Sequence, residues 1–123
     1  MDKKVLIVED DTFLRELYHE MLSDSGYEVE VALDGEEGLS KMNEAKFDLI
    51  LLDIMMPKKD GLQVLKEATD ENKKKIVMLT NLGQDQVIKN ALSLGARGYL
   101  IKSEFAPDEV EAKVRDFISE QQA

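Results

Sequence analysis

The sequence predicts an α/β fold, a doubly wound parallel sheet of five strands with five helices, and two observations support it. Short apolar runs alternate along the chain with longer segments in which apolar residues recur every three or four positions. Several of the short runs are continuously apolar, as strands buried on both faces of a parallel sheet are. Such alternation places helices on both faces of the sheet, joined by right-handed crossovers. Residues 1–123 are enough for one domain of this kind.

The first two strand–helix units are marked by changes in the apolar pattern. Val5–Val8 is a run of four apolar residues, and Val29–Ala32 is the second predicted strand. Asp34 with Glu37 has the spacing of a capping box and predicts the start of the second helix. The first helix is predicted from a stripe of apolar residues that ends before Gly26: Leu14, Leu17, Tyr18, Met21 and Leu22.

The third unit begins with the uniformly apolar run Leu49–Leu52. Asp60 with Gln63 repeats the capping spacing and predicts the start of the third helix. The charged run Asp70–Lys75 carries no helical stripe, so we interpret it as a solvated loop leading to the fourth strand.

The last two units follow the same scheme. Ile76–Leu79 is the fourth strand, and a helix from about Gln84 to Leu94 is stopped by Gly95. Tyr99–Ile101 is the fifth strand, and the last helix opens near Pro107. The residues that this helix is expected to bury are Val110, Val114, Phe117 and Ile118.

Composition and charge exclude several classes of function. The chain is 43% hydrophobic and 34% charged, which is typical of a globular domain. Its net charge of −10 repels nucleic acids and anionic membranes, so we expect no direct binding to either. Without cysteine there is no disulfide, thiolate metal site or cysteine nucleophile. No apolar run has the length of a signal peptide core or a membrane span, and we interpret the chain as cytoplasmic.

Polar side chains gather where the predicted strands end. Ligands of such sheets bind beyond the carboxyl ends of the strands. The candidates there are Glu9, Asp10 and Asp11 after the first strand, Asp53 after the third, Thr80 after the fourth and Lys102 after the fifth. We therefore expect these side chains to converge at one edge of the sheet.

This set of groups predicts a metal-assisted phosphoryl-transfer site. Adjacent carboxylates such as those of Glu9–Asp11 repel each other by about 4 kcal/mol near a protein surface, so a counter-charge is expected. Carboxylate oxygens suit Mg²⁺, and Mn²⁺ is possible. A phosphoryl group accounts for Lys102 and Thr80, because its oxygens require a cation and a hydroxyl donor. Asp53, on the central strand, is the carboxylate best placed to accept it.

Four sequence segments resemble motifs of the receiver domain of two-component response regulators. They are IVEDD, DIMMPKKDG (Asp53–Gly61), MLTN and GARGYLIK, and they occur in the family's order with family-like spacing. The resemblance extends from Lys4 to about Ile118. It implies a flavodoxin-like (βα)5 fold with strand order 2-1-3-4-5.

The resemblance also implies roles for individual residues. Asp53 is the phosphoacceptor, and Lys102 contacts the phosphate. The implied metal ligands are Glu9, Asp10, Asp53 and the backbone carbonyl of Met55. Thr80 and Tyr99 are the implied switch residues, although Tyr99 taken alone predicts core packing. Asp11 and Asn81 are accessory, and Asp11 is equally well explained as a helix cap.

The function implied is a phosphorylation switch. A sensor histidine kinase or a phosphotransfer protein donates a phosphoryl group to Asp53, and the surface of the fourth helix, fifth strand and fifth helix changes. An unknown effector domain or target protein reads that change, and the chain is a monomer or a weak, phosphorylation-dependent dimer. The chain is expected to catalyse only its own phosphorylation and dephosphorylation. The dephosphorylation is expected to be slow, because Met55 and Leu82 offer no group to orient an attacking water molecule.

Three other classes of protein share parts of this pattern. An aspartate-nucleophile phosphatase needs a second acid two residues after Asp53, where Met55 stands. A flavin carrier needs a phosphate loop where this chain has three carboxylates. A phosphorylation-independent adaptor stays open, because Ser103 replaces the cis-proline usual in the family, and Asn81 is larger than the residue common there. Ser103 leaves the Lys102–Ser103 bond either strained or trans.

Overall fold

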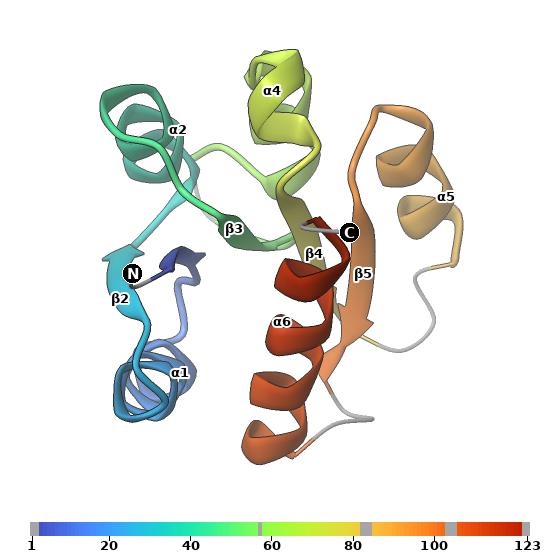
Figure 1. Ribbon diagram of the computed structural model, residues 1–123. Helices are drawn as coiled ribbons and strands as arrows, with labels where there is room; N and C mark the ends of the chain where they lie inside the picture. Colours follow the sequence, from blue (N-terminus) through green and yellow to red (C-terminus); the bar gives the residue numbers. More distant parts are fainter. Residues whose placement is uncertain (1–2, 57, 82–84, 103–105, 122–123) are drawn as a thin grey trace.

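A computed structural model of the protein shows one five-stranded parallel sheet between two layers of helices (Figure 1). The structure describes residues 3–56, 58–81, 85–102 and 106–121. The strands are β1 (Lys4–Val8), β2 (Glu28–Ala32), β3 (Leu49–Asp53), β4 (Ile76–Thr80) and β5 (Gly98–Ile101). Their order is β2-β1-β3-β4-β5, and all neighbouring pairs are parallel. The predicted fold class and strand order are confirmed.

The helices cover both faces of this sheet. They are α1 (Thr12–Asp24), α2 (Gly35–Glu44), α3 (Gly61–Glu67), α4 (Asp70–Lys73), α5 (Asp85–Ser93) and α6 (Pro107–Gln121). In Figure 1, α1 and α6 lie on one side of the sheet, and α2, α4 and α5 lie on the other. Every helix in the described parts of the chain is too short or too polar to serve as a membrane span.

The core is divided by the sheet into two apolar layers. Leu6, Ile50 and Met78 pack against residues of α2, α3 and α5. Val5, Leu49 and Val77 face the opposite way, against residues of α1 and α6. Because β1, β3 and β4 are covered on both faces, their apolar residues are all fully buried. This double burial explains why these strands appear in the sequence as unbroken apolar runs.

Aspartate side chains begin three of the helices. Asp34 accepts a hydrogen bond from the amide of Glu37 at 2.9 Å, and Asp60 accepts one from the amide of Gln63 at 2.9 Å. Asp11 caps α1 in the same way, 3.0 Å from the amide of Leu14. Each bond satisfies an amide that has no partner within its helix. The predicted starts of the second and third helices are confirmed, and so is Asp11 as a cap.

The prediction of a loop at Asp70–Lys75 is wrong, because residues 70–73 form the short helix α4. The Thr69 hydroxyl accepts a hydrogen bond from the amide of Asn72 at 3.1 Å and caps this turn. The Asn72 side chain is buried and donates to the carbonyl oxygen of Met42 at 3.3 Å. Helix α4 buries one amide side chain and no set of apolar side chains, so no apolar stripe in the sequence marks it as a helix. The described residues therefore form six helices, where five were predicted.

The last two predicted helices correspond to α5 and α6. Helix α5 ends at Ser93, and Gly95 follows with a φ of 108°, as its predicted role as a stop requires. Gln84, the predicted start of this helix, lies outside the described residues. Helix α6 buries Val110, Val114 and Ile118, whereas Phe117 is only partly buried.

We expect Gly61→Ala to destabilise the fold by about 1–3 kcal/mol, although alanine is the better helix former. A Cβ at this position would lie 2.5 Å from the carbonyl oxygen of Asp53 and 2.8 Å from the Cα of Ile54. Both atoms belong to the backbone, so the contact is relieved only by moving the end of β3. The free energy of unfolding, measured in urea, checks this against Gln63→Ala on the same helix. Equal stabilities would contradict the close packing.

Candidate functional site

The candidate site lies at the carboxyl edge of the sheet, where four strands end beside one another. Val8 pairs with Leu52, so the residues that follow them at the ends of β1 and β3 are neighbours. Thr80, at the end of β4, pairs with Ile101, and Lys102 follows directly. The edge thus brings together side chains from segments that are far apart in the sequence.

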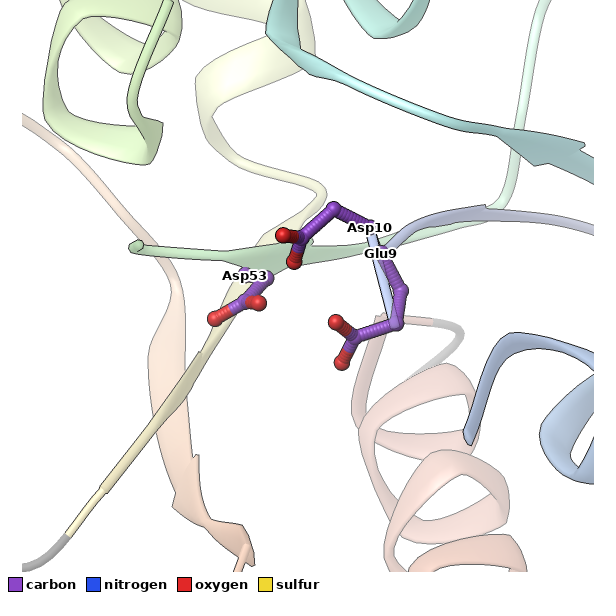
Figure 2. Close-up of side chains that lie close together, drawn as sticks. All are labelled: Glu9, Asp10 and Asp53. Carbon is purple, nitrogen blue, oxygen red and sulfur yellow. The ribbon is translucent and has the colours of Figure 1, made fainter. Parts of the chain in front are cut away.

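Three carboxylates converge at this edge. One oxygen from each of Glu9, Asp10 and Asp53 lies within 4.8 Å of the other two, and Figure 2 shows these side chains approaching one another from β1 and β3. Glu9 and Asp53 are buried, while Asp10 is exposed. In a magnesium ion's octahedral shell, donor oxygens are about 3–4 Å apart. Small side-chain movements would bring these three within that range, so the donor set fits such an ion.

Lys102 bridges two of these carboxylates. Its Nζ is 2.7 Å from Oε1 of Glu9 and 3.1 Å from Oδ2 of Asp53, and its side chain is 14% exposed. The second oxygen of Glu9 accepts a hydrogen bond from the amide of Asp11 at 3.1 Å. Both oxygens of the fully buried Glu9 therefore have protein partners. The metal-ligand role of Glu9 stays a prediction, and a metal ion bound at Oε1 of Glu9 would compete with Lys102 for that oxygen.

Burial and the neighbouring charges shift the pKa values of Asp53 and Lys102. Burial, followed by the hydrogen bond and charge of Glu9, raises the pKa of Asp53 to about 7, although Lys102 acts in the opposite direction. Burial acts to lower the pKa of Lys102, but Glu9 and Asp53 outweigh it and raise that pKa above its ordinary value. One cation is thus shared between two carboxylates, and Asp53 is held less favourably as an anion here than it would be in water.

These shifts predict that metal-free Asp53→Asn is more stable than the wild type at alkaline pH. Because its pKa is raised, Asp53 keeps its proton in the folded protein between about pH 4 and pH 7, whereas in the unfolded chain it has lost it. The free energy of unfolding of the wild type therefore falls as pH rises through that range. We expect the variant to be more stable by about 1–3 kcal/mol at pH 8, and by less at pH 5. Urea unfolding in EDTA at both pH values measures this. An advantage that grew toward pH 5 would contradict the shift.

Three other predicted site residues lie on or just after β3, β4 and β5. Thr80 is buried, and its hydroxyl donates to the carbonyl oxygen of Asn81 at 3.3 Å. The amide of Met55 donates to Oδ1 of Asp53 at 3.4 Å, and its side chain extends outward. Tyr99 is 43% exposed, so the expectation that it packs in the core is wrong. It lies on β5, an edge strand, where one face has less cover. The roles of these residues stay predictions.

Two residues of the sequence interpretation cannot be placed. Ser103, which follows Lys102, and Leu82, which we expected beside the site, lie outside the described residues. Asn81 is exposed, and its effect on access to Asp53 also stays a prediction.

One residue near the site was missed by sequence reasoning. Arg15 lies in the first turn of α1, and its Nη1 donates to the carbonyl oxygen of Glu9 at 3.0 Å and to that of Asp10 at 3.4 Å. A signal was present, because an arginine four residues after Asp11 is on the first helical turn beside the acidic run.

Comparisons with known proteins agree with this geometry. A family model described as the response regulator receiver domain matches residues 5–115. The chain is 41% identical over 116 residues to the probable transcriptional regulator ycf27 of Cyanophora paradoxa, and these cover 94% of the chain and 48% of that protein. It is also 41% identical to the alkaline phosphatase synthesis transcriptional regulatory protein PhoP of Bacillus subtilis, with the same coverage of 94% and 48%. The chain thus spans about half the length of these relatives.

A solved structure is similar over almost the whole chain. It is a CheY-like response regulator receiver domain protein from Methanospirillum hungatei, with a TM-score of 0.91 and 31% identity. The match covers 99% of this chain and 98% of that one.

Proposed function

The chain belongs to the family of response regulator receiver domains, and on that premise we propose that Asp53 is its phosphoacceptor. The observation that carries this proposal is the position of the Asp53 carboxylate. It has the Nζ of Lys102 at 3.1 Å and the carboxylates of Glu9 and Asp10 nearby. A cation and a carboxylate pair around one nucleophile are what phosphoryl transfer to a carboxylate requires.

In the proposed reaction, a carboxylate oxygen of Asp53 attacks the phosphorus of a phosphohistidine on the donor. The oxygen–phosphorus bond forms as the phosphorus–nitrogen bond breaks, and the bonding electrons return to the imidazole of the donor. Lys102 stabilises the negative charge on the phosphoryl oxygens, and the Thr80 hydroxyl can donate a hydrogen bond to one of them. Before transfer, Lys102 is already held at the site by Glu9 and Asp53, so little reorganisation is required.

Glu9, Asp10, Asp53 and the backbone carbonyl of Met55 are the residues proposed to hold Mg²⁺, or Mn²⁺ in its place. A bound ion of this kind neutralises charge on the transferred phosphoryl group and on the carboxylates. The donor set supports this assignment, since the three carboxylates that converge here offer only oxygen atoms.

The proposed output is a change in the surface formed by α5, β5 and α6. Thr80 ends β4 next to β5, which carries the half-exposed Tyr99. A phosphoryl group that draws the Thr80 hydroxyl toward Asp53 would favour a conformation in which Tyr99 turns inward. Tyr99 is 43% exposed, so such a rotation would bury part of its side chain.

The partners proposed are a sensor histidine kinase or phosphotransfer protein and a separate effector. The two relatives named above are described as transcriptional regulators and are about twice as long, which supports an effector domain on a longer form of this protein. The net charge of −10 supports the view that this segment does not itself bind nucleic acid. We place the reaction in the cytoplasm, where kinases have access to ATP. The domain itself is proposed to be residues 1–123, monomeric or weakly dimeric once phosphorylated.

The test is phosphorylation by a small donor. Incubation with acetyl phosphate and Mg²⁺ should add one phosphoryl group, seen in the intact mass, and EDTA should prevent it. A phosphorylation-independent adaptor is the alternative, and family membership does not favour it. An unchanged mass, together with no chemical-shift change on adding beryllium fluoride and Mg²⁺, would support the adaptor instead.

A further inference from the structure

Arg15 lies where it can control the backbone that carries the acidic pair. Besides its bonds to the carbonyl oxygens of Glu9 and Asp10, its Nη2 is 3.5 Å from the hydroxyl of Thr12, at the long limit for a hydrogen bond. The guanidinium therefore spans the connection between β1 and α1. The guanidinium is planar and rigid, so its N–H donors have fixed relative positions, and the acceptors that bind them are held in fixed relative positions as well.

The carbonyl groups of Glu9 and Asp10 lie between strand β1 and helix α1, where the regular backbone hydrogen bonds of the strand and of the helix end. The pairing of β1 with β2 and β3 stops at Val8, and only the amide of Glu9 continues it, by donating to Ala32. On the helix side, the first bond runs from the amide of Arg15 to the carbonyl of Asp11. Within the described parts of the chain, Arg15 is the donor found for the carbonyls of Glu9 and Asp10.

The direction of the Asp10 side chain depends on these same peptide groups. Its carboxylate is exposed and makes no hydrogen bond or ion pair with another described residue, so among the described residues its direction is set by its own backbone. Glu9, by contrast, is held at its carboxylate by Lys102 and the amide of Asp11. Rotation of the Asp10 peptide would move its carboxylate away from Asp53.

We propose that Arg15 is a positioning residue for the metal site: by binding the carbonyls of Glu9 and Asp10, it holds the Asp10 carboxylate toward Asp53. This inference rests on the proposed function, because it assigns a role in magnesium binding. Arg15 touches neither the phosphoryl group nor the ion in this role. Its action is through the backbone, in the manner of the groups that orient metal ligands from outside the coordination shell.

Two physical effects of Arg15 have opposite signs and can be separated. Its positive charge, acting through space, disfavours a divalent cation at the acidic cluster. Its hydrogen bonds favour the same cation by orienting the ligand. Removing the side chain tightens magnesium binding if charge dominates and weakens it if positioning dominates. The sign of the change therefore decides between them.

The experiment is a Mg²⁺ titration of the metal-free chain, followed by backbone amide chemical shifts in wild type, Arg15→Gln and Arg15→Lys. We expect the half-saturating concentration to rise about 10-fold in Arg15→Gln, the lower end for the loss of an orienting partner. Arg15→Lys keeps the charge, which repels the cation, but loses the fork, so its half-saturating concentration should rise at least as far as that of Arg15→Gln. Arg115→Gln is the matched control, since Arg115 is exposed on α6 and pairs with Glu111 at 3.6 Å.

A second readout separates positioning from a general loss of structure. Phosphorylation of Arg15→Gln by acetyl phosphate should be slow at low Mg²⁺ and return to nearly the wild-type rate at saturating Mg²⁺. Tighter or unchanged magnesium binding in Arg15→Gln would overturn the inference, as would a rate deficit that saturating Mg²⁺ leaves intact. A wild type that shows no saturable magnesium binding would overturn the proposed function itself, whatever the variants show.

Discussion

Asp53→Asn should abolish phosphorylation by acetyl phosphate, lowering the rate at least about a thousandfold at saturating magnesium. Asparagine has nearly the same shape but no anionic oxygen to attack phosphorus. Because Asp53 is buried beside Lys102, the amide can keep a hydrogen bond to the lysine, so the fold should be retained. Intact mass after timed incubation measures the loss.

Asp60→Asn provides the matched control for this experiment. Asp60 lies seven residues along the same connection and caps α3 by accepting from the amide of Gln63. Asparagine caps helices about as well as aspartate, so this variant should be phosphorylated at close to the wild-type rate. Continued phosphorylation of Asp53→Asn would show that another carboxylate is the acceptor, and the exposed Asp10 would then be the first to examine.

Lys102→Met should impair both stability and phosphoryl transfer. The lysine is the cation paired with the fully buried Glu9, so its loss leaves a buried carboxylate without compensation. Removing one partner of such a pair costs about 3–5 kcal/mol. Because the pKa of Asp53 is raised to about 7, protonation of Asp53 should reduce that cost at pH 5. Transfer from acetyl phosphate should fall about 100-fold or more, because charge on the phosphoryl oxygens loses its stabilising cation.

A double variant separates the two effects of Lys102. Glu9→Gln combined with Lys102→Met removes the buried charge together with its partner and should recover much of the stability without recovering transfer. Lys66→Met, at an exposed position on α3, controls for replacement of a lysine as such. If Lys102→Met and Lys66→Met unfolded at the same urea concentration, the ion pair with Glu9 would not contribute to stability.

Much of the fold could be predicted because its causes are local or periodic. Strands buried on both faces must be apolar at every position, and β1, β3 and β4 show that directly in the sequence. Helix starts were predicted at Asp34 and Asp60 because a cap needs a particular side chain three residues from its amide. Helix α4 was missed because it buries no apolar stripe: the side chain that it buries is Asn72, which bonds to the backbone of Met42, a contact between distant parts of the chain.

The residues of the candidate site were also predictable, but their partners were not. The carboxyl ends of parallel strands meet at one edge, so any polar residue that ends a strand is a candidate. Which of these charged side chains form ion pairs depends on the length and direction of each side chain in the folded protein. Lys102 binds Glu9 across 93 positions of sequence as well as Asp53, and this leaves Asp10 as the exposed carboxylate of the trio.

By itself, the sequence determined the α/β architecture, the strand positions and the set of side chains at one edge, because hydrophobic periodicity and strand polarity are properties of the chain. Only the tertiary structure decided that Lys102 is held between two buried carboxylates, that Tyr99 faces outward and that Arg15 holds the acidic turn. Those facts depend on distances between segments that become neighbours only when the sheet is assembled. The interaction between two charged groups weakens as the distance between them grows and strengthens as they are buried, and neither distance nor burial can be obtained from the order of the residues alone.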